Sequence, residues 1–362
     1  PATPRRLARS SPRGVAVLPG PMLRTAAVHV PSHAPVDVGA AFLPTLLAAS
    51  VATGQPVRLD GFRAEAARPG LLRPDLAVVR AAAAACGAEV EGDTVGSTAL
   101  TFRPGAVRPG EIRVAVGAGG SAVRVIEAVL PALLVADGPS RLVVDGATFS
   151  VASLGAEALR QSVAPVLCRM GADVRVTVER VGFAPVGGGR VVVEIRPGAL
   201  SAIDLETRGP EVGRRVRAVV SGLPVRVARR TLAAAADALA GSSFVVALDA
   251  VEASGPGIAL VAEVVTTDGV AVQSAIGAPG VASTEVAARL ARRVRAVLAS
   301  DAPVVPEAVP ALIVPLALAG GGALRTCGLG TRARLAVEAV RQAGIAVRVL
   351  DEPGGAVRVL VG

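Results

Sequence analysis

The feature that most constrains the fold is a pattern that occurs three times along the chain. At 82–91, 166–176 and 340–349, an amphipathic stretch leads to a glycine and then to an alternating stretch. Glycine is typical just beyond the C-terminus of a helix, because it adopts a positive φ without steric cost. A turn and another alternating stretch follow each copy. The pattern therefore predicts a helix, a strand, a hairpin turn and a second strand each time.

A second similarity lies upstream of each copy. Residues 42–61 resemble residues 129–146 and, more loosely, residues 309–328. Each of these stretches is typical of a helix, a short loop and a strand. Together the two patterns define a β-α-β-α-β-β unit that the chain uses three times.

The spacing of the copies predicts an insertion. Gly87 and Gly171 lie 84 residues apart, whereas Gly171 and Gly344 lie 173 residues apart. The excess of 89 residues is too long for a loop within a compact domain. We therefore expect an α/β fold in which three repeated units form the main body and a small α/β domain is inserted between units two and three.

The repeats and the insertion together predict the domain boundaries. Both ends of the inserted domain should lie close together, because it interrupts a continuous domain. The main domain is expected to contain a connecting helix just after the insert. The expected ranges are an Arg-rich, disordered extension at 1–24, main domain at 25–200, insert at 201–276 and main domain again at 277–362.

Three consecutive glycines, Gly187–Gly189, have two interpretations. Glycine-rich turns often hold phosphates, but these glycines occupy the place in unit two that a hairpin turn occupies in units one and three. Hairpin turns need the positive φ that glycine supplies. The hairpin is therefore favoured over a phosphate cradle.

The charge of the chain suits a polyanionic partner. All 38 basic residues are Arg, and the net charge is +9. The clusters at 214–217, 226–230 and 289–295 are candidates for following an RNA backbone, with a solvated helix or strand face as the alternative for each. Aromatic residues make up only 2% of the chain, so few side chains are available for stacking on bases.

The cysteines and the apolar segments indicate a cytoplasmic protein that does not enter a membrane. Cys86, Cys168 and Cys327 lie far apart, and each is expected to be a small core residue in a reducing compartment. The Arg-rich N-terminus lacks the apolar region of a signal peptide. Prolines interrupt the longest apolar run, at 309–324, which predicts a core helix and not a membrane span.

Four stretches of the chain resemble the RNA 3'-terminal phosphate cyclase family: 62–76, 96–105, 116–146 and 182–189. The resemblance runs from about residue 36 to the C-terminus, and the family also has three such units with a small domain before the third. It implies ATP-dependent conversion of an RNA 3'-phosphate into a 2',3'-cyclic phosphate through an adenylylated histidine, with ATP and Mg²⁺ or Mn²⁺ as cofactors. The related enolpyruvyl transferases use the unit six times and rely on Lys, which this chain lacks.

The resemblance places Arg332, in the stretch 330–336, where the family has its nucleophilic histidine. A guanidinium stays protonated and has no lone pair to offer. The two histidines, His29 and His33, lie in unit one. Cys327 could substitute only with a lowered pKa. We therefore predict no catalytic residue.

The resemblance implies that other positions of the family pattern also differ. Glu127 stands where a glutamine helps to hold the nucleotide, which leaves at most a remnant of a nucleotide site. Glu307 and Pro310 stand where the family has the tyrosine and aspartate of its adenine pocket. Phe149 and Ser150 replace two residues of a polar triplet.

The loop at 31–39 corresponds to a family loop that contains a glutamate among glycines, and it keeps only Gly39. Asp37 in this loop is a candidate metal contact, with an exposed loop residue as the favoured alternative. We therefore predict no metal site.

The anion-binding part of the family pattern is better kept. The stretch 117–125 places two glycines and a serine at a helix start, where free N–H groups favour an anion, although a plain N-cap is an equal alternative. Three arginines surround the stretch 68–73, and at least Arg63 matches a family position near the phosphates. The predicted phosphate- or RNA-binding residues are Arg63, Arg68, Arg73, Gly119, Gly120, Ser121 and Arg332.

These observations predict a cyclase-family protein whose catalysis is impaired and whose partner is RNA with a 3'-phosphate end. The leading alternative is a non-catalytic module that binds an RNA end or a protein partner. An active cyclase with a different nucleophile, and another transferase built on the same repeats, remain open.

Overall fold

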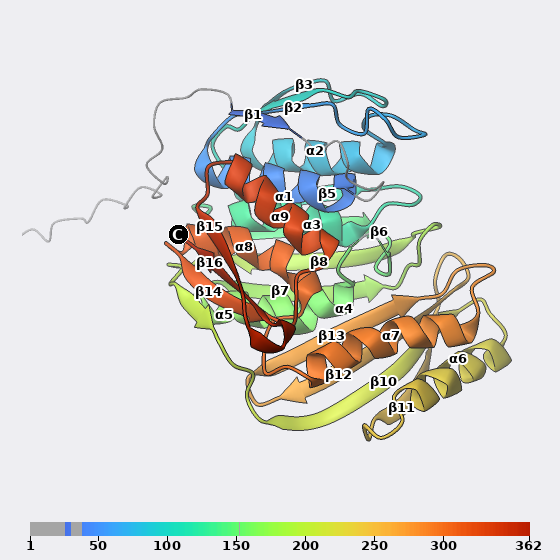
Figure 1. Ribbon diagram of the computed structural model, residues 1–362. Helices are drawn as coiled ribbons and strands as arrows, with labels where there is room; N and C mark the ends of the chain where they lie inside the picture. The colour runs from blue at the N-terminus through green and yellow to red at the C-terminus, as the bar shows by residue number, and fades with distance from the viewer. Residues whose placement is uncertain (1–25, 30–37, 152) are drawn as a thin grey trace, which may run out of the picture.

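The computed structural model describes residues 26–29, 38–151 and 153–362 (Figure 1). Helices and mixed sheets make up this part of the chain, so the predicted α/β class is confirmed. The extension at 1–24, His33 and Asp37 lie outside the described residues.

The first sheet is built from residues of unit one, in the order β1-β2-β4-β3. The strands β1 and β2 are parallel, and the other neighbours are antiparallel. Its elements are β1 (Ala26–His29), α1 (Val38–Thr53), β2 (Val57–Asp60), α2 (Arg73–Cys86), β3 (Glu89–Glu91) and β4 (Leu100–Arg103).

The second sheet has the order β5-β6-β8-β7, in which the four strands follow one another as in the first sheet. Its second helical segment contains a π-helical turn, η1, between two short α-helices. The elements are β5 (Glu111–Ala115), α3 (Ala122–Leu133), β6 (Ser140–Gly146), α4 (Ala156–Ala158), η1 (Leu159–Val163), α5 (Ala164–Arg169), β7 (Asp173–Arg180) and β8 (Gly189–Arg196).

The turn between β7 and β8 contains the glycine triplet. Gly187 and Gly188 have φ of 79° and 73°, the left-handed region in which a side chain is strained. The strands on either side pair in antiparallel register. The hairpin prediction is therefore confirmed, and the glycines are needed for the turn itself.

The third sheet joins strands that are far apart in the sequence, in the order β15-β16-β14-β9. The parallel pair β9–β14 closes one edge of it. The elements of this part are β9 (Ile203–Leu205), η2 (Pro306–Ala308), α8 (Val309–Leu318), β14 (Gly322–Thr326), α9 (Thr331–Gln342), β15 (Val347–Asp351), η3 (Pro353–Gly355) and β16 (Val357–Val361).

A fourth sheet, with the order β11-β10-β12-β13, stands apart from these three at the lower right of Figure 1. Two helices, α6 and α7, pack against each other and against this sheet. We call these six elements the lobe. They are β10 (Glu211–Ser221), α6 (Val225–Ala238), β11 (Val245–Ala250), β12 (Gly257–Thr266), β13 (Gly269–Ile276) and α7 (Ser283–Leu298).

The lobe differs from the expected insert, 201–276, at both ends. Strand β9 falls inside that range but pairs with β14 in the third sheet. The sequence did not reveal this strand, because three residues are too few to show a period. Helix α7, expected to connect back into the main domain, buries Leu290 and Val294 in the core of the lobe. The segments by which the chain enters and leaves the lobe lie side by side, because the Arg208 N–H donates to the Asp301 carbonyl at 2.6 Å.

Three helices, one from each of the first three sheets, form the centre of the body. Helices α1, α3 and α8 contact one another, and every residue of α3 is buried. A helix that is apolar all round is stable only when it is surrounded by protein. Helix α3 nevertheless carries two charged residues, Arg124 and Glu127, into this centre. Arg124 pairs there with Asp75, and Glu127 pairs with Arg332.

The cysteines do not all lie in the core. Cys86 is buried and Cys327 is half-buried, but Cys168 is exposed on α5, so its expected core position was wrong. Among the described residues, no helix combines the length and the apolar character that a membrane crossing requires.

Candidate functional site

The centre of the site is an ion pair between α9 and α3. The Arg332 Nη2 lies 3.1 Å from Oε1 and 3.0 Å from Oε2 of Glu127. The side chains of Glu127 and Arg332 are only 2% and 15% exposed. The family resemblance in the sequence led us to expect both residues at positions that differ from the family pattern. In the structure they neutralise each other.

Two nitrogens of Arg332 remain without a partner. Its Nε and Nη1 atoms are buried and have no hydrogen-bond partner among the described residues. Leaving a buried donor unsatisfied is costly, and more so when it is charged. Arg332 also lines a cavity of about 250 Å³. An anion with several acceptor oxygens would satisfy these donors once the side chains that cover them move aside.

The Arg332 cavity lies where three parts of the molecule meet. Ser150 and Ser153 come from the loop after β6, and Ser274 comes from β13 of the lobe. Hydroxyl groups of this kind both donate and accept hydrogen bonds, which suits phosphate and ribose oxygens. Arg289 and Arg293 of α7 complete the lobe side of the wall.

Glu307 is the one carboxylate among the described residues that line this cavity. It accepts a hydrogen bond from Gln273 Nε2 at 3.0 Å, and the Arg293 Nε lies 3.7 Å from it. The two contacts join η2 to the lobe. Its negative charge is therefore partly compensated.

Arg63, expected to meet a phosphate, is held instead by Asp75. The Arg63 Nη1 lies 2.6 Å from Asp75 Oδ2, and the Arg124 Nη2 lies 2.8 Å from Asp75 Oδ1. Asp75 also accepts the Leu72 N–H at 2.9 Å, which caps the start of α2. The only sequence signal for Asp75 was an acidic residue in the first turn of a helix.

Arg68 and Arg73 are exposed, and neither lines the Arg332 cavity. Arg73 instead begins α2 and borders a shallow groove together with Arg80. The structure therefore does not bring the three arginines of unit one together with Arg332.

The predicted anion site at the start of α3 is largely used by the protein itself. The Gly119 N–H donates to the Pro185 carbonyl at 2.6 Å, and the Gly120 N–H donates to a carbonyl in the preceding turn. The hydroxyls of Ser121 and Ser153 are 2.6 Å apart. The structural interpretation is favoured here, and Ser121 reaches the Arg332 cavity only through Ser153.

Cys327 does not have the properties of a substitute nucleophile. Burial, together with the nearby Glu307 carboxylate, raises the pKa of its thiol to about 11. A nucleophilic cysteine requires a lowered pKa, because the thiolate is the reactive form.

Two further residues that were expected to depart from the family pattern have structural roles here. The Phe149 ring stacks on Phe183, with centroids 5.3 Å apart. Pro310 is buried in α8.

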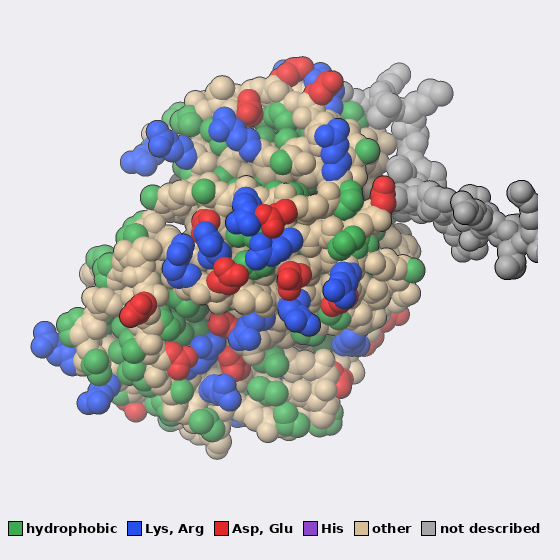
Figure 2. Space-filling view, turned by 180° about the vertical axis from the view of Figure 1, so that it is seen from behind, with side chains coloured by type: hydrophobic (Ala, Val, Ile, Leu, Met, Phe, Trp, Pro, Cys, Tyr) green, Lys and Arg blue, Asp and Glu red, His purple; other side chains and the backbone are tan. Residues whose placement is uncertain are grey.

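The Arg cluster at 214–217 is mostly engaged in ion pairs. Arg217 lies 2.7 Å from Asp249, 3.4 Å from Glu263 and 3.5 Å from Glu157, so it ties the lobe to unit two. In Figure 2, Arg side chains lie among acidic side chains across the middle of the face shown. The arginines visible on that face therefore form no continuous basic track.

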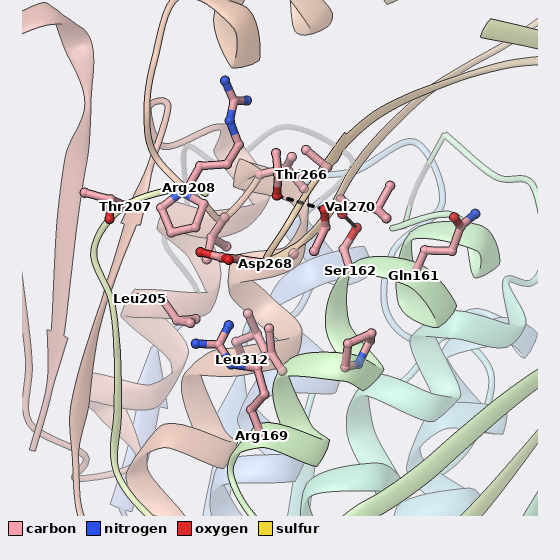
Figure 3. Close-up of a pocket in the computed structure, with 18 of the residues that line it drawn as sticks. Gln161, Ser162, Arg169, Leu205, Thr207, Arg208, Thr266, Asp268, Val270 and Leu312 are labelled. Atoms are coloured by element: carbon pink, nitrogen blue, oxygen red, sulfur yellow. Dashed lines mark hydrogen bonds between the residues drawn. The ribbon is translucent and has the colours of Figure 1, made fainter. Parts of the chain in front are cut away.

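A second cavity, of about 270 Å³, lies between α5 and the turn that joins β12 to β13 (Figure 3). The Arg169 guanidinium and the Asp268 carboxylate both line it, and Ser162 Oγ closes one side by donating to the Val270 carbonyl at 2.6 Å. None of the residues predicted from the sequence as binding residues lines this cavity. Within the described part of the chain, no group of three or more metal-ligating side chains is present.

Comparison with known proteins gives a consistent result over most of the chain. The family model described as RNA 3'-terminal phosphate cyclase matches residues 37–347. The RNA 3'-terminal phosphate cyclase of Ectopseudomonas mendocina (strain ymp) is 38% identical over 307 residues, which cover 84% of this chain and 89% of the relative. That of Salmonella typhimurium is 40% identical over 287 residues, covering 79% and 84%. That of Koribacter versatilis is 37% identical over 306 residues, covering 84% and 86%. The chain belongs to the RNA 3'-terminal phosphate cyclase family.

Proposed function

We propose that this protein binds the 3'-phosphate end of RNA in the Arg332 cavity without becoming adenylylated there. The observation that carries the proposal is the pair of buried, unpartnered donors on Arg332. The proposal also assumes that Arg332 stands at the position of the family's nucleophile. The surplus of Arg over acidic residues favours association with RNA in general. A cytoplasmic location is part of this proposal.

The residues around the cavity fit an anion better than a metal–triphosphate complex. The two nearby carboxylates are already engaged, Glu127 by Arg332 and Glu307 by Gln273. A bound ATP would supply an α-phosphate for attack, but Arg332 offers no lone pair. We therefore derive no nucleotidyl-transfer step for this chain.

The first expected result is the absence of self-adenylylation. With α-labelled ATP and Mg²⁺ or Mn²⁺, we expect no acid-labile protein adduct. Arg332→His alone should not create one, because an imidazole beside the buried Glu127 carboxylate would favour its protonated form, which lacks a lone pair. The Salmonella typhimurium relative, under the same conditions, serves as the positive control. A labelled adduct on the unmodified protein would overturn the catalytic part of the proposal.

The second expected result is a preference for one RNA end. A 3'-phosphorylated oligonucleotide should bind about ten-fold or more tightly than its 3'-hydroxyl counterpart, as one charge-assisted contact provides. The affinity for both should fall steeply with salt. Replacing both members of the ion pair (Glu127→Gln with Arg332→Gln) should remove the end preference but keep general RNA binding.

Arg334→Ala is the matched control, since Arg334 is an exposed arginine on the same turn of α9. It should keep the end preference. Equal affinity of the unmodified protein for both RNA ends, at two salt concentrations, would contradict the proposal and favour a protein-binding scaffold.

A further inference from the structure

Two arginines of the lobe face the same cavity as Arg332. Arg289 and Arg293 lie four residues apart on α7 and therefore on one face of that helix. Both line the cavity, whereas Arg292 of the same helix does not. Arg295 is turned toward α6, where its Nη2 donates to the Ala238 carbonyl at 2.6 Å. Of the arginines on α7, only Arg289 and Arg293 therefore line the cavity.

We propose that Arg289 and Arg293 bind the backbone phosphate that precedes the 3'-terminal phosphate of RNA. This assignment rests on the proposed binding of the terminal phosphate at Arg332. The terminal group would occupy the buried end of the cavity, and the strand would leave along α7. The lobe thereby acquires a role as the part of the molecule that holds the strand next to its end.

Exposure distinguishes the two ends of this path. The Arg332 side chain is 15% exposed, but those of Arg289 and Arg293 are 36% and 47% exposed. The buried end suits a terminal phosphate, which the cavity can enclose. The exposed end suits a phosphodiester, which must continue into the rest of the strand.

The present contacts of the two arginines leave them able to meet a phosphate. Arg289 pairs with the exposed Glu285 one turn earlier on α7, and exposed pairs of this kind contribute little. Arg293 donates through Nη1 to the Ser274 carbonyl at 2.7 Å, which holds its side chain over the cavity. Its Nε lies 3.7 Å from Glu307, beyond hydrogen-bond distance.

The test compares two probes on three variants. The first probe is an RNA hexamer, made in one form with a 3'-phosphate and in another with a 3'-hydroxyl. The second probe is a nucleoside 3'-monophosphate, which lacks the preceding phosphate. The variants are the double substitution Arg289→Gln with Arg293→Gln, the charge-retaining double substitution Arg289→Lys with Arg293→Lys, and the control Arg292→Gln. Thermal melting of each variant verifies that the lobe is folded.

The glutamine pair should weaken both hexamers about ten-fold and lower the magnitude of the salt slope by roughly 0.7, the value for one single-strand phosphate contact. Competition by the nucleoside 3'-monophosphate should change less than about two-fold, since that probe has no phosphate to place at α7. The lysine pair should restore most of the affinity, because phosphate accepts a point charge. Arg292→Gln should leave all probes near the unmodified values.

Two failures are distinguishable. If the glutamine pair weakens the hexamers no more than Arg292→Gln while the preference for the 3'-phosphate persists, the assignment of α7 is wrong and the proposed function stands. An equal loss for the nucleoside 3'-monophosphate also overturns it, because α7 would then act on the terminal group. If the unmodified protein shows no 3'-phosphate preference, the proposed function itself fails.

Discussion

Replacing Asp75 with alanine is expected to lower the free energy of unfolding by about 3–5 kcal/mol. Asp75 is buried and accepts hydrogen bonds from both Arg63 and Arg124, which are themselves buried or nearly so. Without the Asp75 carboxylate, the guanidinium groups of Arg63 and Arg124 would stay buried with fewer hydrogen-bond acceptors. The same change removes the acceptor of the Leu72 N–H at the start of α2. Denaturant unfolding measures the effect.

Asp93→Ala provides the matched control for this prediction. Asp93 also pairs with an arginine, Arg80, at 3.4 Å, but both side chains are exposed. Exposed pairs contribute at most about 1 kcal/mol, so this substitution should change stability little. Equal effects of the two substitutions would show that burial does not determine the contribution of Asp75.

The second large effect is expected at the ion pair between Glu127 and Arg332. Glu127→Gln or Arg332→Gln alone should destabilise the protein by about 3–5 kcal/mol, because each leaves the other charge buried and unpaired. The double substitution should be much less destabilising than the sum of the two single ones, since it leaves neither charge behind. The measurement is a double-mutant cycle by denaturant unfolding in the absence of RNA.

Strict additivity in this cycle would mean that the two residues do not interact in solution. A strong coupling would mean that the two residues act as one unit, in which a buried glutamate accommodates the arginine. Arg334→Gln, an exposed substitution on the same helix, should cost less than about 0.5 kcal/mol.

The sequence predicted the elements that depend on neighbours along the chain. The similarity among residues 42–61, 129–146 and 309–328 located the central helices. The glycine triplet located the hairpin between β7 and β8, because positive φ is a property of the residue itself. The sequence also showed that an arginine stands at 332. It did not show β9, because three residues are too few to display a period.

The sequence by itself determined the α/β class, the family and the residue types available to the site. Only the tertiary structure decided which charges meet. Glu127 and Arg332 are separated by 205 positions and are brought together because α3 and α9 pack into one core. Arg63 was assigned to a phosphate, yet Asp75 holds it. Backbone conformation follows largely from local chemistry, but the partner of a buried charge follows from packing, which no short stretch of sequence contains.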